Sequence, residues 1–132
     1  MTEKEIEDAI KYWGITANHD YDTMLALLKI KRYSDSLFFG HIILEKLLKG
    51  LVVKETGEQA PYTHDLVRLA KLANIGSSEE EIIFLNDVNE FNIRARYPKQ
   101  KFEFYKQSTP KYTEENLNKI KDMYKKLCQK LR

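Results

Sequence analysis

One segment of this 132-residue chain, SLFFGHIILEKLLKGLVV at residues 36 to 53, restricts the fold more than any other. Its apolar residues cover most of the circumference of a helix, and such a helix needs neighbours on several sides. Gly40 and Gly50 would let those neighbours approach closely. Gly57 follows as a C-terminal stop, so we predict a central helix over about 34–55.

The segments before and after the central helix also have helical spacing. Apolar residues recur every three or four positions in the first part of the chain, which predicts one helix over about 3–31. Thr2 and Glu5 are placed to form its capping box. After the loop TGEQAPYT, the motif THDL predicts a short helix over about 65–73, capped by Thr63 or His64.

The last third of the chain is predicted to hold two more helices. One should start at a cap on Ser77 or Ser78 and end at Tyr97, because Pro98 disfavours a helical conformation in the residue before it. Residues 99–112 are expected to form a connection with at most one short turn. A final helix would then start at a Thr113 cap.

No stretch alternates between apolar and polar residues as a strand does, and no repeat is visible. We therefore predict one all-α domain over residues 1–132. Hydrophobic residues make up 42% and charged residues 32%, as in a folded globular chain. No apolar run could span a membrane, no export signal is evident and the one cysteine cannot form an internal disulfide, so we expect a cytoplasmic protein.

The common motifs of catalysis and cofactor binding are absent. The three histidines (His19, His41 and His64) lack partners at the four-residue spacing of helical metal ligands, and there is no glycine-rich phosphate loop. We therefore expect no metal and no cofactor. Because the net charge is only +2, any affinity for phosphate must come from local clusters of basic residues.

The central helix carries one line of polar residues. His41, Glu45 and Lys49 are four residues apart and share one face. They form either a solvated strip with a Glu45–Lys49 pair, or the lining of a groove between two helices or two subunits.

The stretch FNIRARYPK, residues 91 to 99, places Arg94 and Arg96 at a helix end. They could complement the helix dipole, with Glu90 paired to Arg94, or they could bind an anion. On a regular helix the two side chains point about 200° apart. They would meet one ligand only if the last turn unwinds; otherwise each serves a different surface.

Together these segments resemble the HEPN domain family, a nucleotide-binding helical domain. The resemblance rests on RYSDSLFFGHIILEKLLKGLVVKETGEQAPYTHDLVRLAKLANI and FLNDVNEFNIRARYP, and so spans nearly the whole chain. It implies a bundle of four to five helices with a long antiparallel pair, and commonly a homodimer. Many members pair with a minimal nucleotidyltransferase in toxin–antitoxin systems, in which the HEPN protein is often a metal-independent ribonuclease.

The chain departs from the pattern of the nuclease members, which use an arginine followed four to six residues later by histidine. No histidine follows His64. Arginine can hold phosphate but is too basic to act readily as a base, so the catalytic base is unknown. The first candidates for nucleotide or phosphate binding are Arg94, Arg96, Tyr97, Lys49 and His41, with Glu45 and His64 behind them.

Three functions follow as hypotheses. The first is a dimer that binds nucleotide or RNA and acts with a nucleotidyltransferase. The second is an active ribonuclease toxin that moves protons with His41, His64 or Tyr97. The third is a structural interaction module, in which the two arginines pair with Glu45 or Glu90.

Overall fold

The computed structural model describes all 132 residues and contains six helices and no strands. The helices are α1 (Glu3–Lys29), α2 (Tyr33–Thr56), α3 (Leu66–Leu72), α4 (Glu79–Arg96), α5 (Pro98–Gln107) and α6 (Pro110–Leu131). The all-α prediction is confirmed, with one helix more than the four to five expected.

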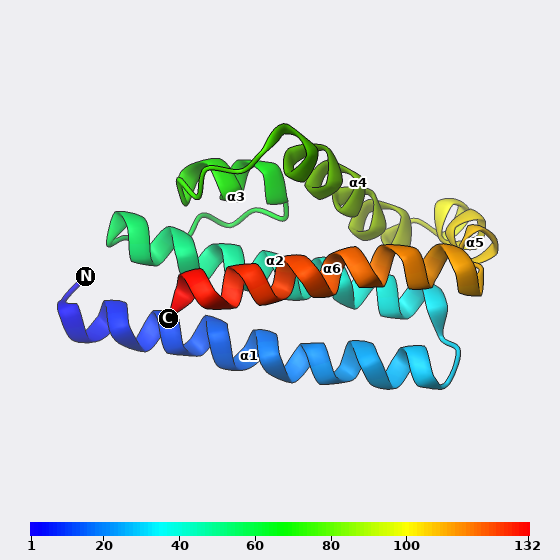
Figure 1. The fold of residues 1–132 in the computed structure, drawn as a ribbon, viewed down its shortest axis with the longest axis horizontal. Coiled ribbons are helices and arrows are strands. Elements are labelled where there is room, and N and C mark those ends of the chain that lie inside the picture. The colour runs from blue at the N-terminus through cyan, green and yellow to red at the C-terminus, as the bar shows by residue number, and fades with distance from the viewer.

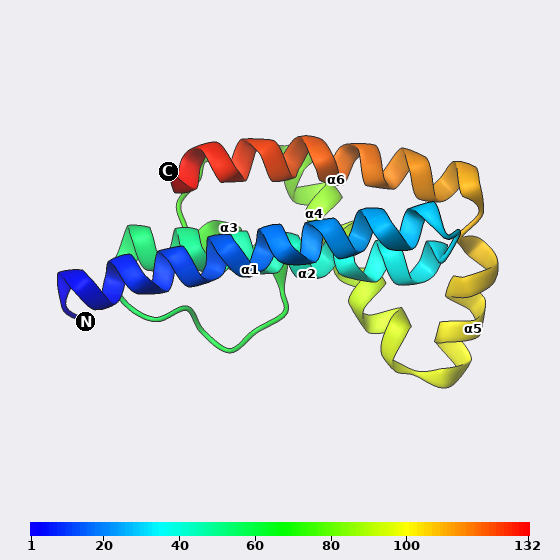
Figure 2. The same ribbon diagram turned by 90° about the horizontal axis from the view of Figure 1, so that it is seen from below.

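Helix α2 is the centre of the bundle and contacts every other helix. It lies antiparallel to α1, and α6 runs along the same pair (Figure 1). Helices α3 and α4 cover another side of α2, and α5 crosses one end of the bundle (Figure 2). The long antiparallel pair is therefore present, and the central position predicted from the apolar segment is confirmed.

Local sequence signals set several of these helix ends. Thr2 and Ser78 each accept a hydrogen bond from the backbone three residues later, and both capping boxes are complete. Gly57 ends α2 with a φ of 70°, a left-handed conformation that glycine adopts at little cost. The first start signal of α4, on Ser77, is not used.

The end of the chain differs from the prediction. Residues 98–107 form helix α5, and α6 is capped by Thr109 rather than Thr113. The physical reason is the same at both places: Pro98 and Pro110 each occupy the first turn of a helix, where a missing N–H costs nothing. Thr113 instead lies buried inside α6.

Glycine lets α6 come close to α2. A Cβ atom added to Gly40 would lie 2.6 Å from Cδ1 of Ile120, a fully buried residue of α6. Gly50 is similarly crowded by Trp13 of α1 and Leu131 of α6. This side of α2 is therefore fixed by close apolar packing, which leaves its polar line facing α3 and α4.

Candidate functional site

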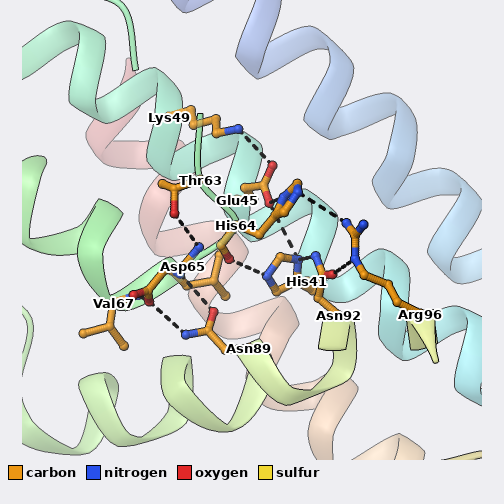
Figure 3. A network of polar contacts seen from close by, with 11 residues as sticks. His41, Glu45, Lys49, Thr63, His64, Asp65, Val67, Asn89, Asn92 and Arg96 are labelled. Atoms are coloured by element: carbon orange, nitrogen blue, oxygen red, sulfur yellow. Dashed lines mark hydrogen bonds and ion pairs between the residues drawn. The ribbon is translucent and has the colours of Figure 1, made fainter. Parts of the chain in front are cut away.

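The polar line of α2 is enclosed by protein rather than solvated. His41 is 0% exposed and Lys49 is 7% exposed, and Glu45 between them is largely covered. The three side chains face the loop before α3 and the end of α4, as Figure 3 shows. The interpretation as a solvated strip is therefore wrong, and the line contributes to a network between helices.

His41 joins three parts of the chain. Its Nε2 lies 2.9 Å from the carbonyl oxygen of His64, which can only accept, so Nε2 donates. Nδ1 then accepts from the Asn92 amide at 3.2 Å, and the amide oxygen of Asn92 accepts from Nε of Arg96. Burial lowers the pKa of His41 below its ordinary value, which agrees with a neutral ring in this chain of bonds.

Glu45 binds two basic side chains through different oxygens. Oε2 accepts from Nζ of Lys49 at 3.1 Å, and Oε1 lies 2.7 Å from Nδ1 of His64. The same Oε1 is 3.9 Å from the His41 ring, too far for a hydrogen bond. Glu45 thus holds Lys49 in place and fixes the orientation of the His64 ring.

His64 reaches the surface from this buried support. With Nδ1 donating to Glu45, the lone pair of Nε2 faces Nη2 of Arg96 at 3.3 Å. The His64 side chain is 42% exposed. A carboxylate that orients an imidazole in this way makes the opposite nitrogen an acceptor, which here is occupied by Arg96; it could act as a general base once a substrate hydroxyl replaces that hydrogen bond.

The backbone around His64 is held on both sides of the residue. His41 donates to its carbonyl, and Asp65 caps α3 by accepting from the N–H groups of Val67 and Arg68. Asn89 of α4 accepts from Leu66 N–H at 2.9 Å and donates to Asp65 at 3.0 Å. The prediction that Thr63 or His64 caps α3 is therefore wrong, because the Asp65 carboxylate reaches both N–H groups.

Arg96 lines a cavity of about 570 Å³ on the surface of α4. The lining residues are His64, Asp65, Asn86, Asn89, Glu90, Asn92, Ile93, Arg96 and Tyr97. No carboxylate lies within ion-pair distance of the Arg96 guanidinium, whose contacts are Asn92 and His64. The pairing of Arg96 with Glu45 or Glu90 that the structural-module hypothesis required does not form.

Arg94 lies on a different surface. It donates to the Gln107 side chain and packs 5.4 Å from the ring centroid of Phe104. It lines a second cavity with Lys99 and Glu103, and the expected pair with Glu90 is absent. Because α4 remains helical through Arg96, the two arginines diverge as their spacing requires.

The structure thus brings together His41, Glu45, Lys49, His64 and Arg96, with Tyr97 at the edge of the same cavity, and leaves Arg94 outside. Asn92 and Asn89 were not among the predicted site residues. A sequence signal existed for Asn92, because it is a polar residue on the predicted apolar stripe of this helix, and the structure buries it. Asn89 carried no comparable signal.

No group of three or more His, Cys, Asp or Glu side chains is arranged to hold a metal ion. None of the six helices combines the length and the apolar character that crossing a bilayer requires.

Comparison with known proteins gives one match. A family model described as HEPN domain matches residues 4–131. Neither the curated proteins nor the solved structures contain a match to this chain.

Proposed function

This chain belongs to the HEPN domain family, and we propose that its cavity beside His64 and Arg96 binds a phosphate group of a nucleotide or RNA. The same proposal includes a homodimer that acts with a nucleotidyltransferase partner in a toxin–antitoxin type of system. The dimer and the partner are proposed from the family resemblance, whereas the phosphate site is proposed from the geometry of the hydrogen-bond network.

The main observation in favour of a phosphate site is that the charge of Arg96 has no carboxylate partner. Its guanidinium is oriented by Asn92 and His64, yet no carboxylate neutralises it. An oriented guanidinium with free N–H groups suits a phosphate, which it can bind through two hydrogen bonds. Tyr97 is exposed at the rim and is a proposed contact, whereas His64, whose Nε2 accepts from Arg96, orients the guanidinium toward the phosphate. Glu45, His41 and Lys49 support them from within.

Arg96→Gln tests this site, with Arg94→Gln as the matched control on the same helix. Loss of a charged hydrogen bond costs about 1.5–3 kcal/mol, so Arg96→Gln should weaken binding of a labelled RNA roughly 10- to 150-fold. Arg94→Gln should change the affinity far less, because Arg94 faces a different cavity. Fluorescence anisotropy measures both, and equal affinity of Arg96→Gln and the unmodified protein would remove the assignment.

A second candidate function is metal-independent RNA cleavage, and the Glu45–His64 contact favours it. Once Arg96 turns from His64 to the phosphate, His64 Nε2 would take the proton of a ribose 2′-hydroxyl while O2′ attacks the adjacent phosphorus. Arg96 would stabilise the charge that develops on the phosphate oxygens. The bond to the 5′ oxygen breaks, that oxygen takes a proton from water, and the products are a 2′,3′-cyclic phosphate and a 5′-hydroxyl.

Cleavage is tested with purified protein and RNA in the presence of EDTA. His64→Ala should abolish cleavage while His19→Ala, an exposed histidine of α1, leaves it unchanged. Glu45→Gln should lower the rate by removing the negative charge beside Nδ1. RNA that stays intact with the unmodified protein would leave binding alone as the function.

Dimerisation is tested separately by light scattering coupled to size-exclusion chromatography. The proposal predicts the mass of two chains. Co-purification of a nucleotidyltransferase with the tagged chain would support the partner, and growth arrest that the partner relieves would support the toxin–antitoxin role.

A further inference from the structure

Helix α5 exposes two aromatic side chains that the fold does not use. Phe102 is 58% exposed and Tyr105 is 68% exposed. Phe104 between them is the one buried residue of α5, and it stacks on Phe91 of α4 with ring centroids 5.5 Å apart. Large aromatic side chains that gather in solvent commonly mark a binding surface.

The two exposed rings line a cavity of about 870 Å³ between α5 and the turn that joins α1 to α2. The lining residues are Lys31, Arg32, Tyr33, Ser34, Asp35, Pro98, Lys101, Phe102, Tyr105, Lys106 and Ser108. On α5 the positions 98, 101, 102 and 105 follow helical spacing, so they share one face. This cavity is distinct from the one that holds Arg96.

The charge in this cavity is positive and largely unpaired. Arg32 is bound to Asp35 at 3.1 Å, but Lys31, Lys101 and Lys106 form no ion pair. Lys106 lies 4.3 Å from the ring centroid of Phe102, over one face of that ring. Cations interleaved with exposed aromatic rings are the arrangement with which proteins bind single-stranded nucleic acid.

Lys31 supports a binding role through its backbone. Its φ is 64°, in the left-handed region where glycine is preferred after a helix. A lysine in this conformation is less stable than a glycine would be. The strained backbone holds the Lys31 side chain at the edge of the aromatic cavity, where its charge adds to those of Lys101 and Lys106.

The aromatic cavity adjoins the phosphate site along the chain. Tyr97 lines the cavity of Arg96, and the next residue, Pro98, lines the aromatic cavity. The rims of the two cavities therefore come together at the Tyr97–Pro98 peptide bond, and only a ligand longer than a mononucleotide could occupy both.

We propose that the face of α5 formed by Phe102, Tyr105, Lys101 and Lys106, together with Lys31, binds single-stranded RNA. Bases stack on the two rings and lysines contact the phosphates, so the ligand is an oligonucleotide rather than a single nucleotide. The course of the strand rests on the proposed phosphate site at Arg96; the stacking surface does not. A second copy of the chain fits this face less well, because symmetric contact would bring the same lysines together.

The experiment measures fluorescence anisotropy of a labelled 12-nucleotide oligouridine and, by calorimetry, the affinity of uridine monophosphate. Phe102→Ala/Tyr105→Ala should weaken oligouridine binding by about tenfold for each ring, with mononucleotide affinity unchanged. Tyr12→Ala removes a similarly exposed ring on α1 and should have no effect. A duplex RNA of equal length should bind the unmodified protein more weakly, because its bases are already stacked.

A salt titration tests the lysines separately. Lys101→Gln/Lys106→Gln should reduce the slope of log affinity against log salt by about 0.7 for each lysine removed. These residues are exposed, so circular dichroism should show unchanged helicity in every variant.

The outcomes separate this inference from the proposed function. Unchanged oligouridine affinity in the aromatic variant overturns the stacking surface, even if Arg96→Gln still weakens mononucleotide binding. Normal mononucleotide and oligouridine binding in Arg96→Gln, with loss in the aromatic variant, overturns the phosphate site alone. Loss of the dimer or of binding to anionic phosphatidylglycerol vesicles in the aromatic variant, with RNA affinity intact, also overturns the stacking surface.

Discussion

Helix α2 has two kinds of surroundings, and they differ in what they contribute. Toward α1 and α6 it packs apolar side chains and glycines closely, as Gly40 does against Ile120. Toward α3, α4 and the loop before α3 it presents His41 and Glu45, each with a polar partner, and Lys49 pairs with Glu45 between the rings of Trp13 and Tyr62. The polar contacts on this side position His64 directly and Arg96 through Asn92.

The largest effect is expected from a substitution on the apolar side of α2. Ile120→Ala should destabilise the protein by about 4 kcal/mol, because it removes a fully buried side chain and leaves a cavity beside Gly40. Urea denaturation measures this loss. The fraction that remains folded should bind RNA with unchanged affinity; a loss of affinity in that fraction would contradict the separation of the two sides.

A similar but smaller effect is expected on the polar side. Glu45→Gln should cost about 3 kcal/mol, because Lys49 keeps its charge at a nearly buried site without its partner. Asp8→Asn removes a carboxylate from the exposed pair with Lys4, which has the same four-residue spacing, and should cost less than about 0.5 kcal/mol. Equal costs in urea denaturation would mean that enclosure of the Glu45–Lys49 pair has no energetic consequence.

The pH dependence of stability gives a further test of the polar side of α2. Burial lowers the pKa of His41 in the folded protein, so below the ordinary value of 6.5 the unfolded chain takes up a proton before the folded one does. Stability should therefore fall as the pH drops below about 6.5, by at most about 1.4 kcal/mol for each pH unit from this group.

His41→Gln isolates that contribution, because glutamine can donate to the His64 carbonyl but does not titrate in this range. Urea denaturation at about pH 7.5 and about pH 5.5 should show a weaker pH dependence in the variant. The same dependence in both proteins would show that His41 is not the group responsible.

The smallest effect lies outside both sides of α2, in the turn before it. Lys31→Gly should raise stability by about 0.5 kcal/mol, since relief of the left-handed conformation exceeds the added freedom of the unfolded chain. The same variant should bind oligouridine more weakly. Thermal unfolding measures the stability, and anisotropy measures the affinity for oligouridine. An increase in both stability and affinity would contradict a binding role for Lys31.

The sequence predicted the parts of the fold that depend on local signals. The long helices, the capping boxes on Thr2 and Ser78 and the stop at Gly57 follow from spacing and side-chain chemistry. Helix α5 was missed because Pro98 was interpreted only as an end, although proline also favours the first turn of a helix. The Thr109–Pro110 start of α6 was missed because Thr113 was predicted to be the cap and the preference of Pro110 for the first turn was not used.

The candidate site was only partly predictable, because its contacts join distant parts of the chain. The four-residue spacing placed His41, Glu45 and Lys49 on one face, and the helical rotation of about 100° for each residue predicted that Arg94 and Arg96 diverge unless α4 unwinds. The approach of His64 to Arg96 depends on the path of the loop after α2, which no local pattern fixes. Contacts of this kind, between residues far apart in the sequence, determine which side chains form the site.

The loop that delivers His64 is anchored near its ends. Gly57 closes α2, and His41 with Asp65 holds the backbone at the far end, whereas Glu58 and Gln59 are exposed. The length of the loop between these anchors is therefore free to vary without moving the imidazole. A short peptide or a reporter group inserted between Glu58 and Gln59, which do not line the cavity, should thus leave its geometry intact.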